Sequence, residues 1–128
     1  MFGFGLATRI YVATGATDMR KSFNGLYGLV RDTLSCEPTS GHVFLFTNAR
    51  RNRLKLLVYD GSGLWVAAKK LDGGRFRWPE SDPTVRKIVL NQEELALLLG
   101  GIDLVQTRRR KWYRQAVVEE PSKSLKTA

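Results

Sequence analysis

The side chains best suited to chemistry lie between residues 41 and 79, and they are cations. This stretch, GHVFLFTNARRNRLKLLVYDGSGLWVAAKKLDGGRFRWP, contains only two carboxylates, Asp60 and Asp72. Its cations are Arg50, Arg51, Arg53, Lys55, Lys69, Lys70, Arg75 and Arg77. The phosphate backbone of a nucleic acid is the most common partner for such a concentration of positive charge. The stretch therefore predicts a surface that binds a polyanion.

Side-chain alternation predicts where these cations point, because successive residues of a strand face opposite sides of the sheet. One face of the expected strand 53–59 would carry the apolar residues Leu54, Leu56 and Val58. The other face would carry Arg53, Lys55, Leu57 and Tyr59. In the expected strand 75–78, Phe76 and Trp78 oppose Arg75 and Arg77. The pattern predicts a sheet with one core face and one basic face.

Two interpretations of the basic face stay open. Rings interleaved with cations suit nucleic acid, because the rings stack on bases or sugars while the cations hold phosphates. Alternatively, the cations protect edge strands of a solvated sheet from aggregation. Arg50 and Arg51 favour a binding surface, because they fall at a hairpin tip where edge protection requires no charge.

A second group of cations lies near the C-terminus, in the segment RRRKWYR. Its cations are Arg108, Arg109, Arg110, Lys111 and Arg114. Together with Trp112 and Tyr113, they are typical of arms that become ordered on contact with phosphate. A solvated tail, or a tail that docks Trp112 on the core, explains the segment equally well.

Charge and length set the limits of these interpretations. The chain has 128 residues, a formal net charge of +9 and an isoelectric point near 10.1. The excess is divided between the part before residue 108 and the last 21 residues, so both parts favour an acidic partner. We expect residues 1–105 to form a single α+β domain. Residues 106–128 are expected to be a basic, largely flexible arm.

The elements that position these side chains are predicted from periodicity and turns. An antiparallel β-meander sheet of about five to six strands is expected from regularly spaced turns at 48–52, 60–63 and 72–74. The expected strands are 9–13, 43–47, 53–59, 64–71, 75–78 and 85–90.

Two helices complete the expected α+β fold. An apolar stripe that includes Phe23, Leu26 and Val30 predicts one main helix over about 19–35, packed on the sheet. Thr17 or Asp18 is expected to cap that helix. The pattern N-x-x-E from Asn91 to Glu94 predicts a capping box that opens a short C-terminal helix over about 92–99.

The sequence gives little support to catalysis. A metal-dependent nuclease requires carboxylates that converge on Mg²⁺, whereas Asp18 is expected to cap a helix and Asp60 and Asp72 fall in glycine-containing turns. Cys36 and His42 are the only cysteine and histidine, which excludes an intramolecular disulfide and a Cys/His zinc site. We expect no enzyme activity, no cofactor and no metal. With no apolar run of 18 residues, we also expect no membrane span and a cytoplasmic location.

Three segments together resemble one known family: GATDMRKSFNGL at 15–26, the basic stretch at 41–79, and LLLGGIDL at 97–104. They are similar to the TnpB accessory proteins of the insertion-sequence sixty-six transposon family, which are unrelated to the RNA-guided nuclease of the same name. The resemblance spans roughly residues 8–114. It implies a bacterial mobile-element protein, encoded beside a separate DDE-type transposase and needed for efficient transposition and its DNA recombination. It supplies no catalytic residues.

Charge and resemblance together favour a non-catalytic accessory protein that binds the DNA backbone. The expected phosphate contacts are Arg50, Arg51, Arg53, Lys55, Arg75 and Arg77, extended by Lys69, Lys70 and the 108–114 arm. The alternative is a protein–protein adaptor that joins the transposase to other components through its positive face. A phosphodiesterase is a distant third possibility.

Overall fold

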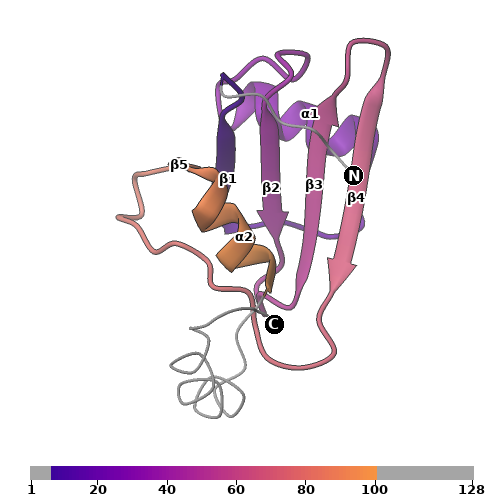
Figure 1. Cartoon of the computed structure of the whole chain (residues 1–128). Helices are drawn as coiled ribbons and strands as arrows, with labels where there is room; N and C mark the ends of the chain where they lie inside the picture. Colours follow the sequence, from indigo (N-terminus) through magenta and orange to yellow (C-terminus); the bar gives the residue numbers. More distant parts are fainter. Residues whose placement is uncertain (1–6, 101–128) are drawn as a thin grey trace.

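The computed structural model describes residues 7–100, which form a five-stranded sheet with a helix on each face (Figure 1). In chain order the elements are β1 (Ile10–Ala16), α1 (Phe23–Asp32), β2 (Val43–Thr47), β3 (Arg53–Tyr59), β4 (Leu64–Lys70), β5 (Lys87–Leu90) and α2 (Gln92–Gly100). The α+β class and both helices were therefore predicted correctly.

The sheet is mixed, with the strand order β4-β3-β2-β1-β5. β1 pairs with β2 in parallel, from Ile10 opposite Val43 to Val12 opposite Leu45, and all other neighbours are antiparallel. The prediction of a purely antiparallel sheet was wrong for this one pair. Two parallel neighbours need a crossover connection, and α1 provides it by returning the chain to the end of the sheet where β1 began.

The antiparallel meander of β2, β3 and β4 is confirmed. The bounds of β2 and β3 agree with the predicted ranges, and β4 ends one residue earlier than predicted, at Lys70. The expected strands at 9–13 and 85–90 are shifted by a few residues to Ile10–Ala16 and Lys87–Leu90. These two strands lie side by side because β5 pairs antiparallel with β1.

Both faces of the sheet are buried, in two separate hydrophobic clusters. On one face, side chains of α1, among them Leu26 and Val30, pack against Phe44, Phe46 and Leu57. On the other face, α2 packs against a second cluster, whose buried members are Ile10, Val12, Val43, Leu45, Leu54, Leu56, Val58, Phe76, Trp78, Leu90, Leu95 and Leu98. The expectation of one basic, open sheet face was therefore wrong. Leu57, predicted to lie on that face, is fully buried beneath α1.

The predicted strand 75–78 is not a strand, although its alternation is real. Phe76 and Trp78 are buried on the α2 face, while Arg75 and Arg77 are exposed. Two hydrogen bonds anchor the segment in place of a regular ladder. The Phe76 amide donates to the Arg51 carbonyl at 2.6 Å, and the Trp78 indole Nε1 donates to the Ala13 carbonyl at 2.9 Å. The segment is thus an anchored crossing over the sheet.

The first helix is shorter than predicted, whereas the second begins as expected. α1 begins at Phe23 because Asp18 does not cap it: the Asp18 carboxylate accepts from the Arg20 amide at 2.9 Å and closes a separate turn. At α2 the predicted capping box is confirmed. The Asn91 amide donates to Glu94 Oε1 at 2.9 Å, and the Glu94 amide donates to Asn91 Oδ1 at 2.7 Å.

Candidate nucleic-acid interface

The tip of the β2–β3 hairpin presents Arg50 and Arg51 on a tightly bonded loop. Asn48 Oδ1 accepts from the amides of Asn52 and Arg53, both at 3.1 Å, and Asn48 Nδ2 donates to Asn52 Oδ1 at 2.7 Å. Arg51 has a φ of 58°, in the left-handed region that costs a non-glycine residue about 1 kcal/mol or more. The Asn48 bonds hold this conformation, so Arg50, which is exposed, and Arg51, which is half-buried, extend from a fixed backbone.

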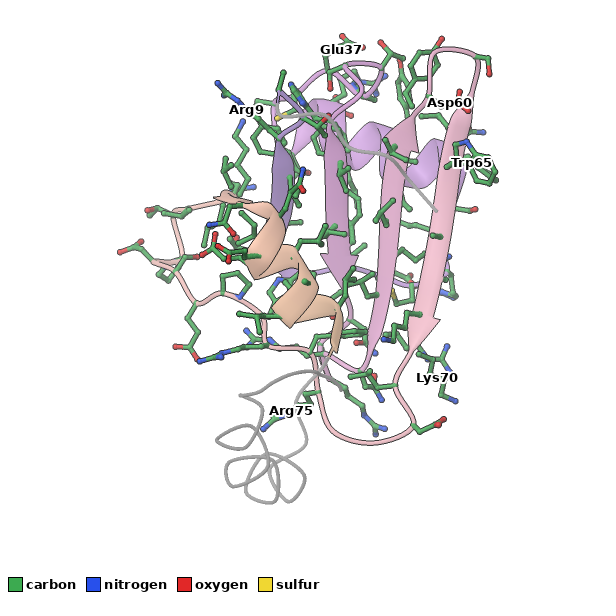
Figure 2. The ribbon with its side chains drawn as sticks, in the orientation of Figure 1. Arg9, Glu37, Asp60, Trp65, Lys70 and Arg75 are labelled. Atoms are coloured by element: carbon green, nitrogen blue, oxygen red, sulfur yellow. The ribbon has the colours of Figure 1, made fainter. Side chains whose placement is uncertain are left out.

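Two backbone hydrogen bonds join this tip to the segment that follows β4. The Leu71 amide donates to the Asn52 carbonyl at 2.9 Å, and the Phe76 amide donates to the Arg51 carbonyl. The tip, the C-terminal end of β4 and the loop after it therefore meet at one end of the sheet, where Figure 2 shows Lys70 and Arg75. We call this group the basic end; its residues are Arg50, Arg51, Arg53, Lys70 and Arg75.

Within the basic end, Arg53 and Lys70 lie directly opposite each other on β3 and β4. The neighbouring pair, Asn52 and Leu71, is hydrogen-bonded. Because pairs alternate along an antiparallel ladder, Arg53 and Lys70 form a non-hydrogen-bonded pair, the type whose side chains approach more closely. Two like charges in this position repel each other.

No carboxylate compensates this repulsion within the part of the chain that the structure describes. The ion pairs found among residues 7–100 are Arg20 with Asp18 at 2.7 Å and Arg31 with Asp32 at 2.8 Å. Neither pair includes a residue of the basic end. None of the five cations therefore has an ion-pair partner within residues 7–100 that would compete with an external anion.

Two predicted contact residues have their ammonium groups committed to the fold. Lys55 is half-buried beneath the start of α1, and its Nζ donates to the Lys21 carbonyl at 2.7 Å. Lys69 Nζ donates to the Leu99 carbonyl at 2.8 Å. It thereby serves as the cation at the C-terminal end of α2, whose last turn contains no basic residue. We assign both lysines a stabilising role.

Arg77 lies apart from the basic end. It is exposed, but it lines a groove of about 420 Å³ beside β5 and α2, together with Glu80, Val89, Glu94 and Leu97. Its neighbours therefore include two carboxylates and exposed apolar side chains, which suit a protein surface better than a phosphate.

Sequence reasoning missed Lys21 and Arg86. Both line a cavity of about 260 Å³ at the C-terminal end of β1. This end of β1 lies beside the hairpin, since Ala16 is paired with Thr47. For Lys21 the available signal was its position in the segment 15–26, between a strand and a helix; the sequence contains no comparable signal for Arg86.

The opposite end of the sheet carries acidic groups, among them Glu37 and Asp60 (Figure 2). The Asp60 carboxylate accepts from the amides of Ser62 at 2.9 Å and Gly63 at 3.0 Å and from Trp65 Nε1 at 2.7 Å. These bonds, that of the Ser62 amide first, hold the pKa of Asp60 well below its usual range. Asp60 is therefore ionised, and it lies in a turn, as the sequence predicted.

Some predictions concern residues or groups that the structure does not place in a site. The arm residues Arg108, Arg109, Arg110, Lys111 and Arg114 lie outside the described residues, as does the whole 106–128 segment. Within residues 7–100, no three His, Cys, Asp or Glu side chains gather as a metal site would require. None of the described helices is long and apolar enough to cross a membrane.

Comparison with known proteins identifies the family. Residues 8–109 match the IS66 Orf2-like proteins. Two uncharacterized proteins of Sinorhizobium fredii are similar: y4jC is 34% identical over 110 residues, covering 86% of this chain and 92% of its own length. The other, y4hO, is 37% identical over 103 residues, covering 80% of this chain and 88% of its own length. No solved structure matches the chain. The resemblance inferred from the three sequence segments is thus confirmed, and the chain belongs to the IS66 Orf2-like family of insertion-sequence accessory proteins.

Proposed function

We propose that this protein assists transposition by binding the DNA backbone through its basic end, without catalysing a reaction. The observation that carries the proposal is the directly opposed couple of Arg53 and Lys70, which has no carboxylate partner among residues 7–100. A phosphate that contacts both cations replaces their repulsion with two charge-assisted hydrogen bonds. Arg50, Arg51 and Arg75 place further positive charge around the same point.

The geometry supports contact with the backbone rather than reading of bases. The basic end consists of a hairpin tip, a strand end and a loop, with no helix that could enter the major groove. Phosphate contacts position a protein on DNA but carry no sequence information. We therefore expect weak intrinsic specificity, with the 108–114 arm extending the contact.

A gel-shift series tests this proposal on four ligands: terminal-repeat DNA, random duplex, single-stranded DNA and RNA. The wild type is expected to bind both duplexes with similar affinity. The triple variant Arg50/Arg51/Arg53→Ala should weaken both complexes. Truncation at Gln106, which removes the basic arm, should also weaken them. Arg9→Ala is the matched control, because Arg9 is exposed at the far end of the sheet (Figure 2). Absence of duplex binding at low salt would refute the proposal.

The alternative is an adaptor that joins the transposase to other components, and the groove beside β5 favours it. Val89 and Leu97 are 52% and 59% exposed at this groove, and apolar side chains exposed together mark protein-binding sites. Co-purification of the transposase from nuclease-treated, DNA-free extract is the test. The association should survive digestion and be lost in Val89→Asp, whereas an association that digestion abolishes argues for DNA as the only link.

A further inference from the structure

The outer edge of β4 carries a second interaction surface. β4 is the last strand of the sheet on its side, and no strand among residues 7–100 pairs with its outer edge (Figure 1). It has seven residues without proline or glycine, whereas β5 at the other edge has four. Trp65 projects from β4 with 52% of its surface exposed. A long edge that has no strand partner among these residues is a template for strand pairing.

The hydrogen bonds of the β3–β4 ladder determine which β4 groups point outward. The pair Asp60–Gly63 at the turn and the pair Asn52–Leu71 at the other end are both hydrogen-bonded. Hydrogen-bonded and non-hydrogen-bonded pairs alternate along the ladder between these two ends. The amides and carbonyls of Trp65, Ala67 and Lys69 therefore point toward β3. The groups that point away from the sheet belong to Leu64, Val66, Ala68 and Lys70.

We propose that a second copy of this chain pairs with β4 in antiparallel orientation, forming one sheet that continues through both subunits. The two-fold axis of such a pair is perpendicular to the sheet, so opposed residues must face the same side. Pairing the whole strand then centres the axis on Ala67. Val66 exchanges hydrogen bonds with Ala68 of the partner subunit, and Leu64 with Lys70 of the partner subunit.

This register makes the edge self-complementary. Trp65 and Lys69 lie on the same face of β4, so Trp65 is placed opposite Lys69 of the partner subunit in a close, non-hydrogen-bonded pair. The aliphatic part of the Lys69 side chain packs on the indole ring of the partner subunit, while its ammonium keeps the bond to the Leu99 carbonyl. The Asp60 carboxylate accepts a hydrogen bond from Trp65 Nε1, and the two side chains lie side by side in Figure 2. Asp60 therefore brings a negative charge to the same contact.

The lysines of β4 also have a competing explanation, since lysine on an edge strand prevents association. In the proposed register, however, neither lysine opposes another lysine. Both lie at one end of the strand, and the antiparallel partner brings its Leu64 and Trp65 to that end. The partner is therefore specified by the uneven distribution of charge along β4 and the turn before it, with Asp60 in that turn and Lys69 and Lys70 at the other end of the strand.

Sedimentation velocity over a concentration series, with the full chain and without DNA, tests the dimer. Ala68→Pro removes an amide that points outward and leaves every bond to β3 intact. It should raise the dimer dissociation constant by at least about tenfold, since one bond is lost on each side of the axis. Ala68→Val retains the amide and is expected to dimerise like the wild type. Circular dichroism verifies that both variants fold.

Amide hydrogen exchange supplies a readout that is specific to the register. The amides of Trp65 and Ala67 should be protected at all concentrations, because they bond β3. The amides of Val66 and Ala68 should become protected only as the dimer forms. A wild type that stays monomeric at its highest soluble concentration overturns the proposal. So does a dimer in which Val66 and Ala68 exchange freely, or one that Ala68→Pro leaves unchanged.

Discussion

Arg53 and Lys70 face each other across β3 and β4 without a carboxylate partner among the described residues. The pair lies beside a hairpin tip whose backbone is fixed by Asn48. In the isolated protein the two charges oppose strand pairing by a few tenths of a kcal/mol. Anion binding reverses the sign of this contribution. The couple is therefore the physical link between the fold and the proposed binding of DNA.

The neighbouring residues Lys69 and Lys70 should differ in their effects on stability. Lys69→Ala removes the hydrogen bond to the Leu99 carbonyl at the end of α2 and should lower the free energy of unfolding by about 1 kcal/mol. Lys70→Ala relieves repulsion with Arg53 and should leave stability unchanged or slightly raised. Urea denaturation of both variants measures the difference. Equal losses would contradict the role assigned to Lys69.

The crossing segment after β4 should depend on the Trp78 indole. Trp78→Phe leaves the Ala13 carbonyl without this donor and creates a cavity, so we expect a loss of about 2–3 kcal/mol. Trp65→Phe is the matched control: it also removes an indole donor, to Asp60, but at an exposed site, so its change should cost less than about 1 kcal/mol. Thermal or urea unfolding in dilute solution measures both. Similar losses for the two variants would show that the indole bond does not anchor the segment.

The turn before α1 should be sensitive to acid. The Arg20 side chain, followed by its amide, lowers the pKa of Asp18 from 3.8 to about 2. Because the folded-state pKa is the lower one, the stabilisation is complete above pH of about 4 and is lost as the pH falls toward 2.

Removing the Arg20 side chain should reverse this shift. In Arg20→Ala, an NMR titration of the Asp18 carboxyl carbon should show a midpoint closer to 3.8. Arg31→Ala, which removes a similarly exposed arginine from the Arg31–Asp32 pair, should leave the Asp18 midpoint unchanged. A wild-type midpoint near 3.8 would show that the Arg20 contact does not persist in solution.

Local signals predicted most of the elements. β2 and β3 were predicted with their correct bounds because each is a short apolar run between clear turns, and α2 was predicted from its capping box. The parallel pairing of β1 with β2 was not predictable in this way. It depends on α1 returning the chain to the end of the sheet where β1 began, and α1 is held in that position by contacts between residues distant in sequence, such as Leu26 and Phe44. The 75–78 segment was misassigned because buried Phe76 and Trp78 alternate like strand residues.

The candidate site was predicted in part. Alternation correctly gave the exposure of Arg53, Arg75 and Arg77, and the turn signal placed Arg50 at a tip. Side-chain alternation did not predict that α1 would cover the middle of the sheet face that carries Arg53 and Lys55. This cover buries Leu57 and leaves Lys55 half-buried. The bonds of Lys55 and Lys69 to backbone carbonyls join segments about 30 residues apart in sequence, and no local pattern indicates such contacts.

If both proposals hold, the dimer should bridge two DNA duplexes. A two-fold axis perpendicular to the sheet directs the basic ends of the two subunits in opposite directions, so one duplex cannot contact both. The wild-type protein should therefore allow bead-bound duplex to capture a second, labelled duplex. Ala68→Pro should bind DNA with unchanged affinity per subunit but recover little labelled duplex, whereas Ala68→Val should recover as much as the wild type. Equal recovery by Ala68→Pro would contradict bridging through β4.

The salt dependence of duplex binding tests the central claim most directly. If the basic end neutralises about five phosphates, the logarithm of the association constant falls against the logarithm of salt concentration with a slope near −4.5. The double variant Arg53/Lys70→Ala should reduce the steepness by about 1.8, and Arg9→Ala should leave it unchanged. Fluorescence anisotropy with a random duplex measures all three slopes. An affinity independent of salt, or the same slope in the double variant as in the wild type, would contradict binding of DNA through the basic end.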